Sequence, residues 1–276
     1  MNWIKKILSG TKTEALIMDK VEISKKVKKT IRKITVIENG KVVALGTGIV
    51  IKNSGLLLTA NHVLGNYGLL SNPKIFVDGI EDIPRLEYKP LLFDVSLNIN
   101  MPDFAKPLNI DLAILEPEQK IDGLPFIETD DVLAQEGENV ILVGFPDEVE
   151  PPLNFDKMLN FDNPKLEKRK SEIESFFSSS MRFMLIKHGM IGNVQKVTLN
   201  VQVDLPEFKK SLTTDGAVYW IDNASTFGAS GGPVINSSGK LIGIICQKGM
   251  TKQDFDLWVP SGSTMALSHK LITWQI

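Results

Sequence analysis

Ser230 stands in the segment GASGGP, residues 228–233, and is the leading candidate for a catalytic nucleophile in this chain. Glycine is usual where the backbone turns sharply or packs closely, and proline fixes φ. Three glycines and a proline around one serine therefore predict an unusual backbone geometry at Ser230. Because a serine hydroxyl is a weak nucleophile at neutral pH, it needs an adjacent base. The sequence offers three histidines for that role.

His62 is the histidine best placed to act as this base. It directly follows the apolar residues 56–60, and the end of a strand holds a side chain rigidly within reach of a partner. We predict His188 in a turn and His269 at the surface of a C-terminal helix, which makes both weaker candidates. The alternative for His62 is a histidine that only caps the end of a strand.

Asp111 is the candidate for the third group, which must orient the imidazole and stabilise its charged form. It opens the apolar run 111–115, and burying a carboxylate is costly unless it is paired. The alternative is a solvent-exposed residue at the start of a strand. The order His62, Asp111, Ser230 is one of the three known chain orders of a catalytic triad. Four other aspartates lie in turn-like or polar surroundings and are weaker candidates: Asp78, Asp82, Asp94 and Asp103.

The elements that must position these residues are short strands. Asn39-Gly40 predicts a tight hairpin turn between residues 34–37 and 41–44. Apolar runs with turn signals between them continue along the chain, at 46–51, 56–60, 74–77, 112–115, 139–144, 181–186, 197–203, 217–221, 233–235, 241–245 and 257–259. This rhythm predicts a sandwich or barrels rather than βαβ units. The lysine run 25–33 is expected to be the solvated face of a helix.

Bulk composition excludes several classes of protein. The 276 residues are 43% hydrophobic and 23% charged, as in folded soluble proteins. A net charge of −2 gives no support for a nucleic-acid partner. No apolar stretch is long enough for a membrane span. Cys246 is the only cysteine, which rules out an intrachain disulfide and fits the cytosol. The histidines lack ligand spacing, so we expect neither a metal nor a cofactor.

Four motifs, taken in chain order, resemble the motifs of one protein family. GTGIVI with LTANHVL resembles the strands that lead to a catalytic histidine, and IDLAIL resembles the stretch that holds its aspartate. LVGFP resembles the opening of a second barrel, and GASGGPVI followed by GKLIGI resembles the nucleophile loop. Over roughly residues 33–275 the chain is similar to chymotrypsin-fold serine proteases. It is most similar to bacterial trypsin-like peptidase domains of the Deg/Htr kind without a PDZ domain.

The resemblance implies a mostly β fold of two six-stranded antiparallel β-barrels, and the residue pattern adds a helix at each end. Together they predict an N-terminal helical extension (1–32), a first barrel (33–120), a linker (121–137), a second barrel (138–262) with an insertion (150–180), and a C-terminal helix (263–276).

The resemblance also implies site residues. The amides of Gly228 and Ser230 would form the oxyanion hole, and Gly228 would need to lack a Cβ. Ala224 would form the floor of the primary specificity pocket, which favours a small or apolar substrate side chain, although Asp256 could approach the same pocket. The strand edge that binds an extended substrate would comprise Ile245, Cys246, Gln247 and Lys248.

The sequence departs from the family pattern at several positions. Asn61 replaces a small residue before the histidine, and Ala229 replaces an acidic or amide residue before the serine. Cys246 stands where many relatives carry a serine beside the aspartate. An amino terminus of the IVGG type is missing, so we expect an enzyme that is active as synthesised or gated by a partner.

We therefore predict a cytosolic serine endopeptidase that acts on protein or peptide substrates. The first alternative is a catalytically silent or partner-gated peptide-binding module on the same fold. The second is a structural β-barrel protein with chance motifs. A regulatory protein partner is expected to bind through residues 1–32 or 150–180, since both lie outside the family resemblance.

Overall fold

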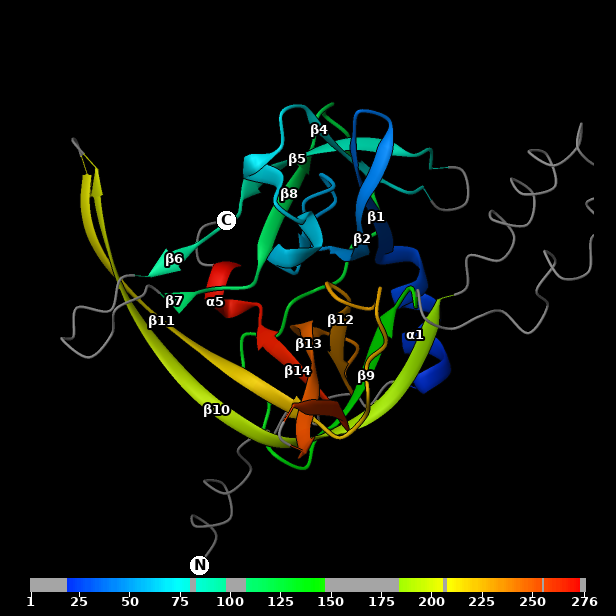
Figure 1. Cartoon of the computed structure of the whole chain (residues 1–276), viewed down its shortest axis with the longest axis vertical. Helices are drawn as coiled ribbons and strands as arrows, with labels where there is room; N and C mark the ends of the chain where they lie inside the picture. Colours follow the sequence, from blue (N-terminus) through cyan, green and yellow to red (C-terminus); the bar gives the residue numbers. More distant parts are fainter. Residues whose placement is uncertain are drawn as a thin grey trace, which may run out of the picture.

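The computed structural model describes residues 19–79, 83–97, 108–146, 184–205, 208–254 and 256–273. Most of the predicted N-terminal extension and the whole of the predicted insertion 150–180 lie outside these residues. The described chain forms two closed barrels of six antiparallel strands each, one above the other in Figure 1. The predicted double β-barrel is confirmed.

The first barrel has the strand order β1-β2-β3-β8-β5-β4. Its strands are β1 (Ile31–Glu38), β2 (Lys41–Val50), β3 (Leu57–Thr59), β4 (Pro73–Val77), β5 (Leu86–Leu92) and β8 (Ala113–Pro117). The turn between β1 and β2 lies at Asn39 and Gly40, as predicted. Their φ values of 50° and 75° are the positive values that a two-residue hairpin turn requires.

The second barrel has the strand order β10-β11-β14-β13-β12-β9. Its strands are β9 (Asn139–Gly144), β10 (Leu185–Leu205), β11 (Phe208–Ile221), β12 (Pro233–Asn236), β13 (Leu241–Asp254) and β14 (Leu257–Ser268). The paired strands β10 and β11 are far longer than the sequence pattern indicates, and they extend beyond the barrel as a curved ribbon (Figure 1).

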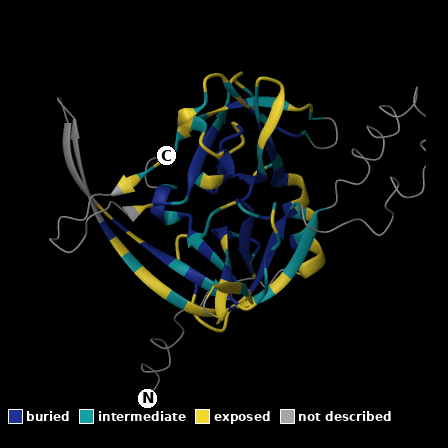
Figure 2. Cartoon of the chain, viewed as in Figure 1, coloured by how far each residue is buried: buried dark blue, intermediate teal, exposed yellow. Residues whose placement is uncertain are grey.

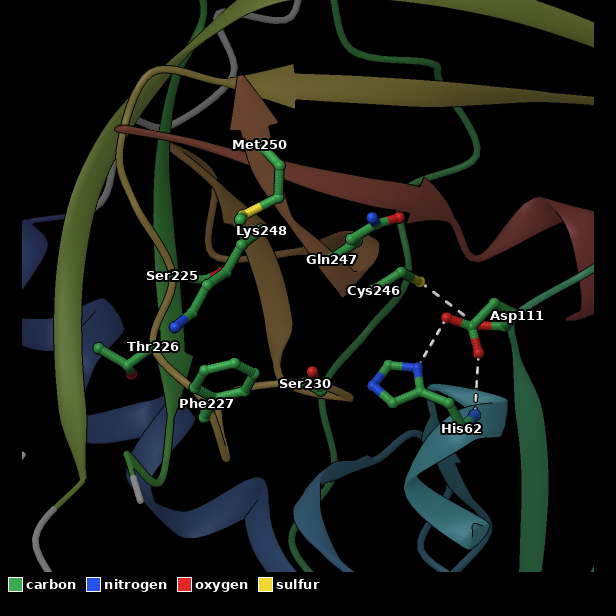
Figure 3. Close-up of a pocket in the computed structure, with 10 residues that line it drawn as sticks. All are labelled: His62, Asp111, Ser225, Thr226, Phe227, Ser230, Cys246, Gln247, Lys248 and Met250. Atoms are coloured by element: carbon green, nitrogen blue, oxygen red, sulfur yellow. Dashed lines mark hydrogen bonds and ion pairs between the residues drawn. The ribbon is translucent and has the colours of Figure 1, made fainter. Parts of the chain in front are cut away.

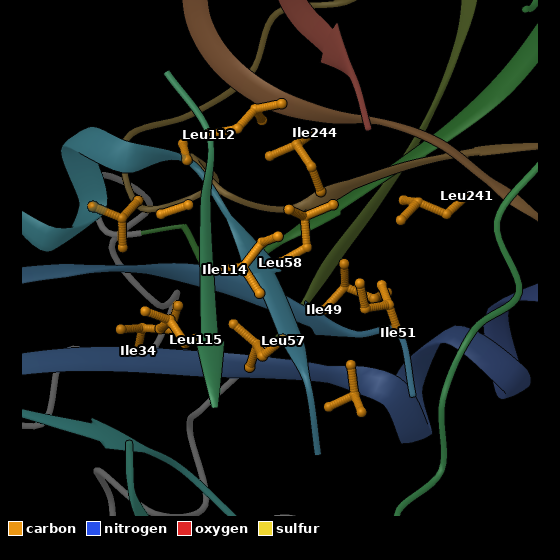
Figure 4. Close-up of a cluster of buried hydrophobic side chains, with 14 of the residues drawn as sticks. Ile34, Ile49, Ile51, Leu57, Leu58, Leu112, Ile114, Leu115, Leu241 and Ile244 are labelled. Atoms are coloured by element: carbon orange, nitrogen blue, oxygen red, sulfur yellow. The ribbon is translucent and has the colours of Figure 1, made fainter. Parts of the chain in front are cut away.

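The two barrels are joined by a shared hydrophobic core, and a second cluster of buried side chains lies mainly within the second barrel. Ile49 and Ile114 of the first barrel and Leu241 and Ile244 of the second belong to a single cluster of buried side chains (Figure 4). Figure 2 shows the buried residues concentrated inside the barrels and at the contact between them. Burial of apolar area on this scale is the main favourable contribution to folding. It also fixes the two barrels against each other, which matters because both barrels contribute residues to the site.

Short helices and one small sheet complete the fold. They are α1 (Lys20–Thr30), the 3-10 turns η2 (Asn61–Leu64) and η3 (Tyr67–Leu69), the strand pair β6 (Ser96–Leu97) and β7 (Leu108–Asn109), and α5 (Lys270–Thr273). Helix α1 buries Ile23 and Val27 and leaves Lys25, Lys28 and Lys29 exposed. The predicted solvated face is confirmed for these lysines of α1, but residues 31–33 of the same run belong to β1, and Arg32 is buried. No helix among the described residues is both long enough and apolar enough to cross a membrane.

The predicted helix over residues 263–276 is wrong for its first six residues, because β14 continues to Ser268 and α5 has only four residues. Thr264, Ala266 and Ser268 are buried at every second position, as in a strand. Met265 and Leu267 on the opposite face also pack against the shared core. Because both faces of β14 are covered, apolar residues occupy odd and even positions alike. The alternation of apolar and polar residues that marks a strand is therefore absent.

Two predictions for the histidines outside the site are also wrong. His188 lies within β10, paired with Ile141 of β9, and not in a turn. His269 lies between β14 and α5 and is buried, with 2% of its surface exposed. Its Nε2 donates a hydrogen bond to the Asp130 carbonyl oxygen over 3.0 Å, so the lone pair lies on Nδ1, 3.1 Å from the hydroxyl of Thr273.

We expect stability to depend on pH through His269. Burial lowers the pKa of this imidazole below its usual value, since the charged form loses its hydration. The unfolded chain therefore binds the proton more readily, and the native state is fully stabilised only above the unfolded pKa of about 6.5. The free energy of unfolding should fall as the pH drops below that value and through the folded pKa.

Urea unfolding between pH 8 and pH 5 measures this dependence. His269→Gln should flatten the fall, whereas His188→Gln, at an exposed position on β10, should keep the slope of the wild type. Equal slopes for all three proteins would contradict the assignment to His269.

Candidate active site

His62 and Asp111 meet because the strands that carry them are neighbours. His62 lies in η2 just after β3, and Asp111 lies just before β8, which pairs with β3. His62 Nδ1 is 2.8 Å from Asp111 Oδ2, and the His62 backbone N–H donates to Asp111 Oδ1 over 2.9 Å (Figure 3). A carboxylate oxygen accepts, so Nδ1 carries the hydrogen and Nε2 keeps its lone pair. The imidazole is thus held in the tautomer that a general base requires.

Asn61 has a clear structural role beside His62. Its Nδ2 donates to Asp94 Oδ1 over 2.7 Å, and the backbone N–H of Asp94 donates to Asn61 Oδ1 over 2.8 Å. This reciprocal pair fastens the turn that carries His62 to the loop after β5. A small residue at position 61 could not make these two hydrogen bonds. Asn61 therefore stabilises the turn that carries His62.

Two consecutive turns shape the loop that carries Ser230. The Ala229 N–H donates to the Thr226 carbonyl over 3.1 Å, and the Gly232 N–H donates to the Ala229 carbonyl over 2.9 Å. The third residue of each turn is a glycine with positive φ, 80° at Gly228 and 82° at Gly231. A type II turn requires this sign of φ at its third position. Ser230 is therefore the second residue of the second turn. Gly228 and Gly231 are needed because each turn requires a positive φ at its third residue.

Thr47 of β2 anchors this loop to the first barrel. Its backbone N–H donates to the Ser230 carbonyl over 2.9 Å, and its Oγ1 donates to the Gly228 carbonyl over 2.7 Å. The same Oγ1 accepts from the Phe145 N–H at 3.1 Å, which orients the hydroxyl. The first barrel therefore holds both turns of the loop beside the His62–Asp111 pair. The sequence analysis did not identify Thr47. The only feature that marks it in the sequence is its position between two glycines.

His62, Asp111 and Ser230 line one cavity of about 460 Å³ at the contact between the barrels (Figure 3). The other residues that line it are Ser225, Thr226, Phe227, Cys246, Gln247, Lys248 and Met250. Within the described part of the chain, no hydrogen bond joins Ser230 Oγ to His62 Nε2. Such bonds are often long in unliganded enzymes and tighten only when substrate binds.

Cys246 lies beside the aspartate, at the place expected for it. Its Sγ donates to the Asp111 carbonyl oxygen over 3.3 Å. Burial raises the pKa of this thiol well above its ordinary value, so the sulfur stays protonated and acts as a weak donor. Its contribution is packing and support for the Asp111 backbone rather than redox chemistry.

The structure divides the predicted substrate-binding residues into two groups. Cys246 and Gln247 line the cavity with Ser230. Ile245 lines a smaller cavity behind the wall formed by Ser225 and Thr226. The Ala224 carbonyl accepts a hydrogen bond from the Lys187 ammonium. Neither Ala224 nor Ile245 is among the described residues that line the larger cavity.

Four cavity residues escaped the sequence analysis: Ser225, Thr226, Phe227 and Met250. Lys248 Nζ lies 3.5 Å from the centroid of the Phe227 ring. These two residues lie on opposite walls of the cavity, so no local pattern in the sequence could have revealed their contact.

Gly231→Ala should strongly destabilise the protein. A Cβ at this position would lie 2.0 Å from the Thr47 carbonyl oxygen and 2.2 Å from Thr59 Oγ1, and φ is +82°. Backbone strain and overpacking together should lower the free energy of unfolding by about 2–5 kcal/mol, measured by urea denaturation. Gly262→Ala is the matched control, with the same φ of +82° and nothing within 4 Å of the added Cβ. An equal loss in both variants would show that the contact with Thr47 is irrelevant.

The fold is similar to solved structures of one protease. The active form of the Rv3671c protease from M. tuberculosis superposes with a TM-score of 0.55 at 18% identity, covering 92% of this chain and 82% of that one. An inactive serine-to-alanine mutant of the same protein gives a TM-score of 0.54 at 18% identity, covering 95% and 91%. No curated protein matches the chain by sequence.

A family model, described as the trypsin-like peptidase domain, matches residues 46–244. This span covers parts of both barrels and contains all three residues that the motifs single out. It confirms the resemblance to chymotrypsin-fold, trypsin-like proteases, and the chain belongs to the trypsin-like peptidase domain family.

Proposed function

We infer that the chain is a serine endopeptidase that hydrolyses peptide bonds of protein substrates. One observation carries this proposal. Asp111 holds His62 at two points, through Nδ1 and through the backbone N–H, and this pair lines the same cavity as Ser230. A histidine with only a structural role at a strand end would not need a carboxylate that fixes which ring nitrogen carries the hydrogen.

The proposed reaction proceeds in two steps. Ser230 Oγ attacks the substrate carbonyl carbon while its proton moves to His62 Nε2, and Asp111 stabilises the imidazolium that forms. The imidazolium then gives this proton to the leaving amine, and the acyl group remains on Ser230. A water molecule, deprotonated by His62, attacks the ester carbonyl and releases the acid with Ser230 restored.

The oxyanion formed in each step would be held by the amides of Gly228 and Ser230. The type II geometry of the turn 226–229 supports this role for Gly228, because that turn depends on the positive φ at this glycine. The bond from Thr47 to the Gly228 carbonyl fixes the orientation of the loop before substrate arrives. Removal of one such donor typically lowers the rate by about 10²–10³.

An extended substrate would add to the edge of β13 at Cys246 and Gln247. Both residues line the cavity beside Ser230, and the pairing of β13 with β12 extends only as far as Ile244. Backbone hydrogen bonds to such an edge would give affinity that is independent of the substrate sequence.

A peptide-binding module that does not cleave is the second candidate. The observation in its favour is the missing hydrogen bond between Ser230 Oγ and His62 Nε2 in the described structure. In that case a regulatory protein partner, bound through residues 1–32 or 150–180, would complete the site. We place either activity in the cytosol, where the single thiol of Cys246 would stay reduced.

Labelling with a fluorophosphonate probe tests the proposed function. The folded protein should form one covalent adduct, located on Ser230 by mass spectrometry of its peptides, and the urea-unfolded protein should form none. Labelling of the folded chain at another residue, or no labelling at all, would favour the peptide-binding module.

A further inference from the structure

The cavity beside Ser230 has a positively charged wall. Lys248 is the one lysine or arginine among the described residues that line it. The Asp111 carboxylate is already paired with His62. A substrate side chain that enters between Thr226 and Gln247 therefore meets the Lys248 ammonium.

The Lys248 ammonium spans the cavity in the unliganded structure. Lys248 projects from β13, where it pairs with Thr264, and its Nζ lies 3.5 Å from the ring centroid of Phe227 on the opposite wall (Figure 3). Phe227 is 62% exposed to solvent. A cation–π contact at such an exposed site is weak, about 0.5–1 kcal/mol. A substrate carboxylate would be a stronger partner for this ammonium than the ring face, because hydrogen bonds between charged groups are the strong ones.

A second lysine adds positive charge behind the same wall. The Lys187 ammonium donates to the Ala224 carbonyl and lines the small space on the far side of Ser225 and Thr226. Two lysines therefore flank the segment 225–226, one on each side. Clefts lined by one sign of charge raise the local concentration of oppositely charged groups.

We propose that this cavity selects an acidic substrate side chain, so that the chain cleaves after glutamate or aspartate, with Lys248 as the specificity-determining residue. The proposal rests on the proposed function and names its substrate class. It replaces the expectation of a small or apolar side chain, which depended on Ala224 as the pocket floor. In the bound state Lys248 Nζ leaves the Phe227 ring and donates to the substrate carboxylate, while Phe227 covers the aliphatic part of that side chain.

The kinetic test uses internally quenched peptide pools that share randomised flanks and differ only in the residue before the scissile bond. Wild type should cleave the glutamate pool with a kcat/KM about tenfold or more above that of the glutamine pool, since a charged hydrogen bond is lost with the amide. Lys248→Met should bring the two pools to within about twofold. Lys252→Met removes a lysine from the same strand that does not line the cavity, and it should keep the wild-type ratio.

A binding test keeps the selectivity separate from the chemistry. Fluorescein-labelled versions of the same pools are titrated into Ser230→Ala and into Ser230→Ala with Lys248→Met, and anisotropy is recorded. The glutamate pool should bind more tightly to the first protein and no more tightly than the glutamine pool to the second.

The outcomes separate the two proposals. A labelled, active enzyme that cleaves both pools equally overturns the acidic selectivity and leaves the peptidase in place. A chain that neither labels nor cleaves, but binds the glutamate pool in a Lys248-dependent way, overturns the peptidase and supports the acidic selectivity. Equal binding of both pools overturns the selectivity in either case.

Discussion

Ser230→Ala should lower kcat for peptide hydrolysis by about 10⁶-fold, the scale seen when a serine peptidase loses its nucleophile. His62→Ala should cost about as much, because the two residues act as one unit. The double variant should be no slower than either single one. The measurement is turnover of a fluorogenic peptide under single-turnover and steady-state conditions, with circular dichroism to show that each variant is folded.

Ser237→Ala is the matched control for this loss. Ser237 is an exposed serine in the turn between β12 and β13 and lies outside the cavity, so its variant should keep full activity. A Ser230→Ala protein that retained more than about a thousandth of wild-type kcat would contradict the nucleophile assignment, since binding and the oxyanion hole alone leave less.

Asp111→Asn should lower kcat by about 10⁴-fold while leaving the fold intact. The reason lies in the two bonds that the carboxylate accepts. The backbone N–H of His62 requires an oxygen at the Oδ1 position, so the amide nitrogen must occupy the Oδ2 position, 2.8 Å from His62 Nδ1. That nitrogen donates, which forces Nδ1 to accept and moves the ring hydrogen to Nε2. The base then has no lone pair facing Ser230.

The comparison variant is Asp94→Asn, which alters the other carboxylate near this turn. Its Oδ1 only accepts from Asn61, and an asparagine oxygen can do the same. Activity of this variant should stay within about tenfold of wild type, because the His62 tautomer is untouched. Similar losses in both variants would mean that the region tolerates no change of charge, and the tautomer argument would fail.

Much of the fold could be predicted because strand signals are local. The Asn39-Gly40 turn and the apolar run 139–144 gave hairpin and strand positions that the structure confirms. The great length of β10 and β11 could not be predicted, because Gly189, Gly192 and the mostly polar residues 209–215 separate the apolar runs of these strands. The helix expected at 263–268 failed because β14 is covered on both faces, which removes the period that distinguishes a strand from a helix.

The candidate site was predictable where chemistry demands particular residue types. His62, Asp111 and Ser230 stand in short motifs, and the structure brings them to one cavity. The supports were not predictable, because they depend on contacts between residues far apart in the chain. Thr47 reaches the loop of Ser230 from the other barrel, and Lys248 meets Phe227 across the cavity.

The anchor at Thr47 has a consequence for the newly made chain. His62 and Asp111 leave the ribosome long before Ser230, yet the serine loop gains its hydrogen bonds to β2 only when the second barrel docks on the first. A nascent or half-denatured molecule therefore holds all three side chains without the alignment needed to cut its neighbours. Under the proposed function, peptide cleavage would therefore be confined to molecules in which both barrels have docked.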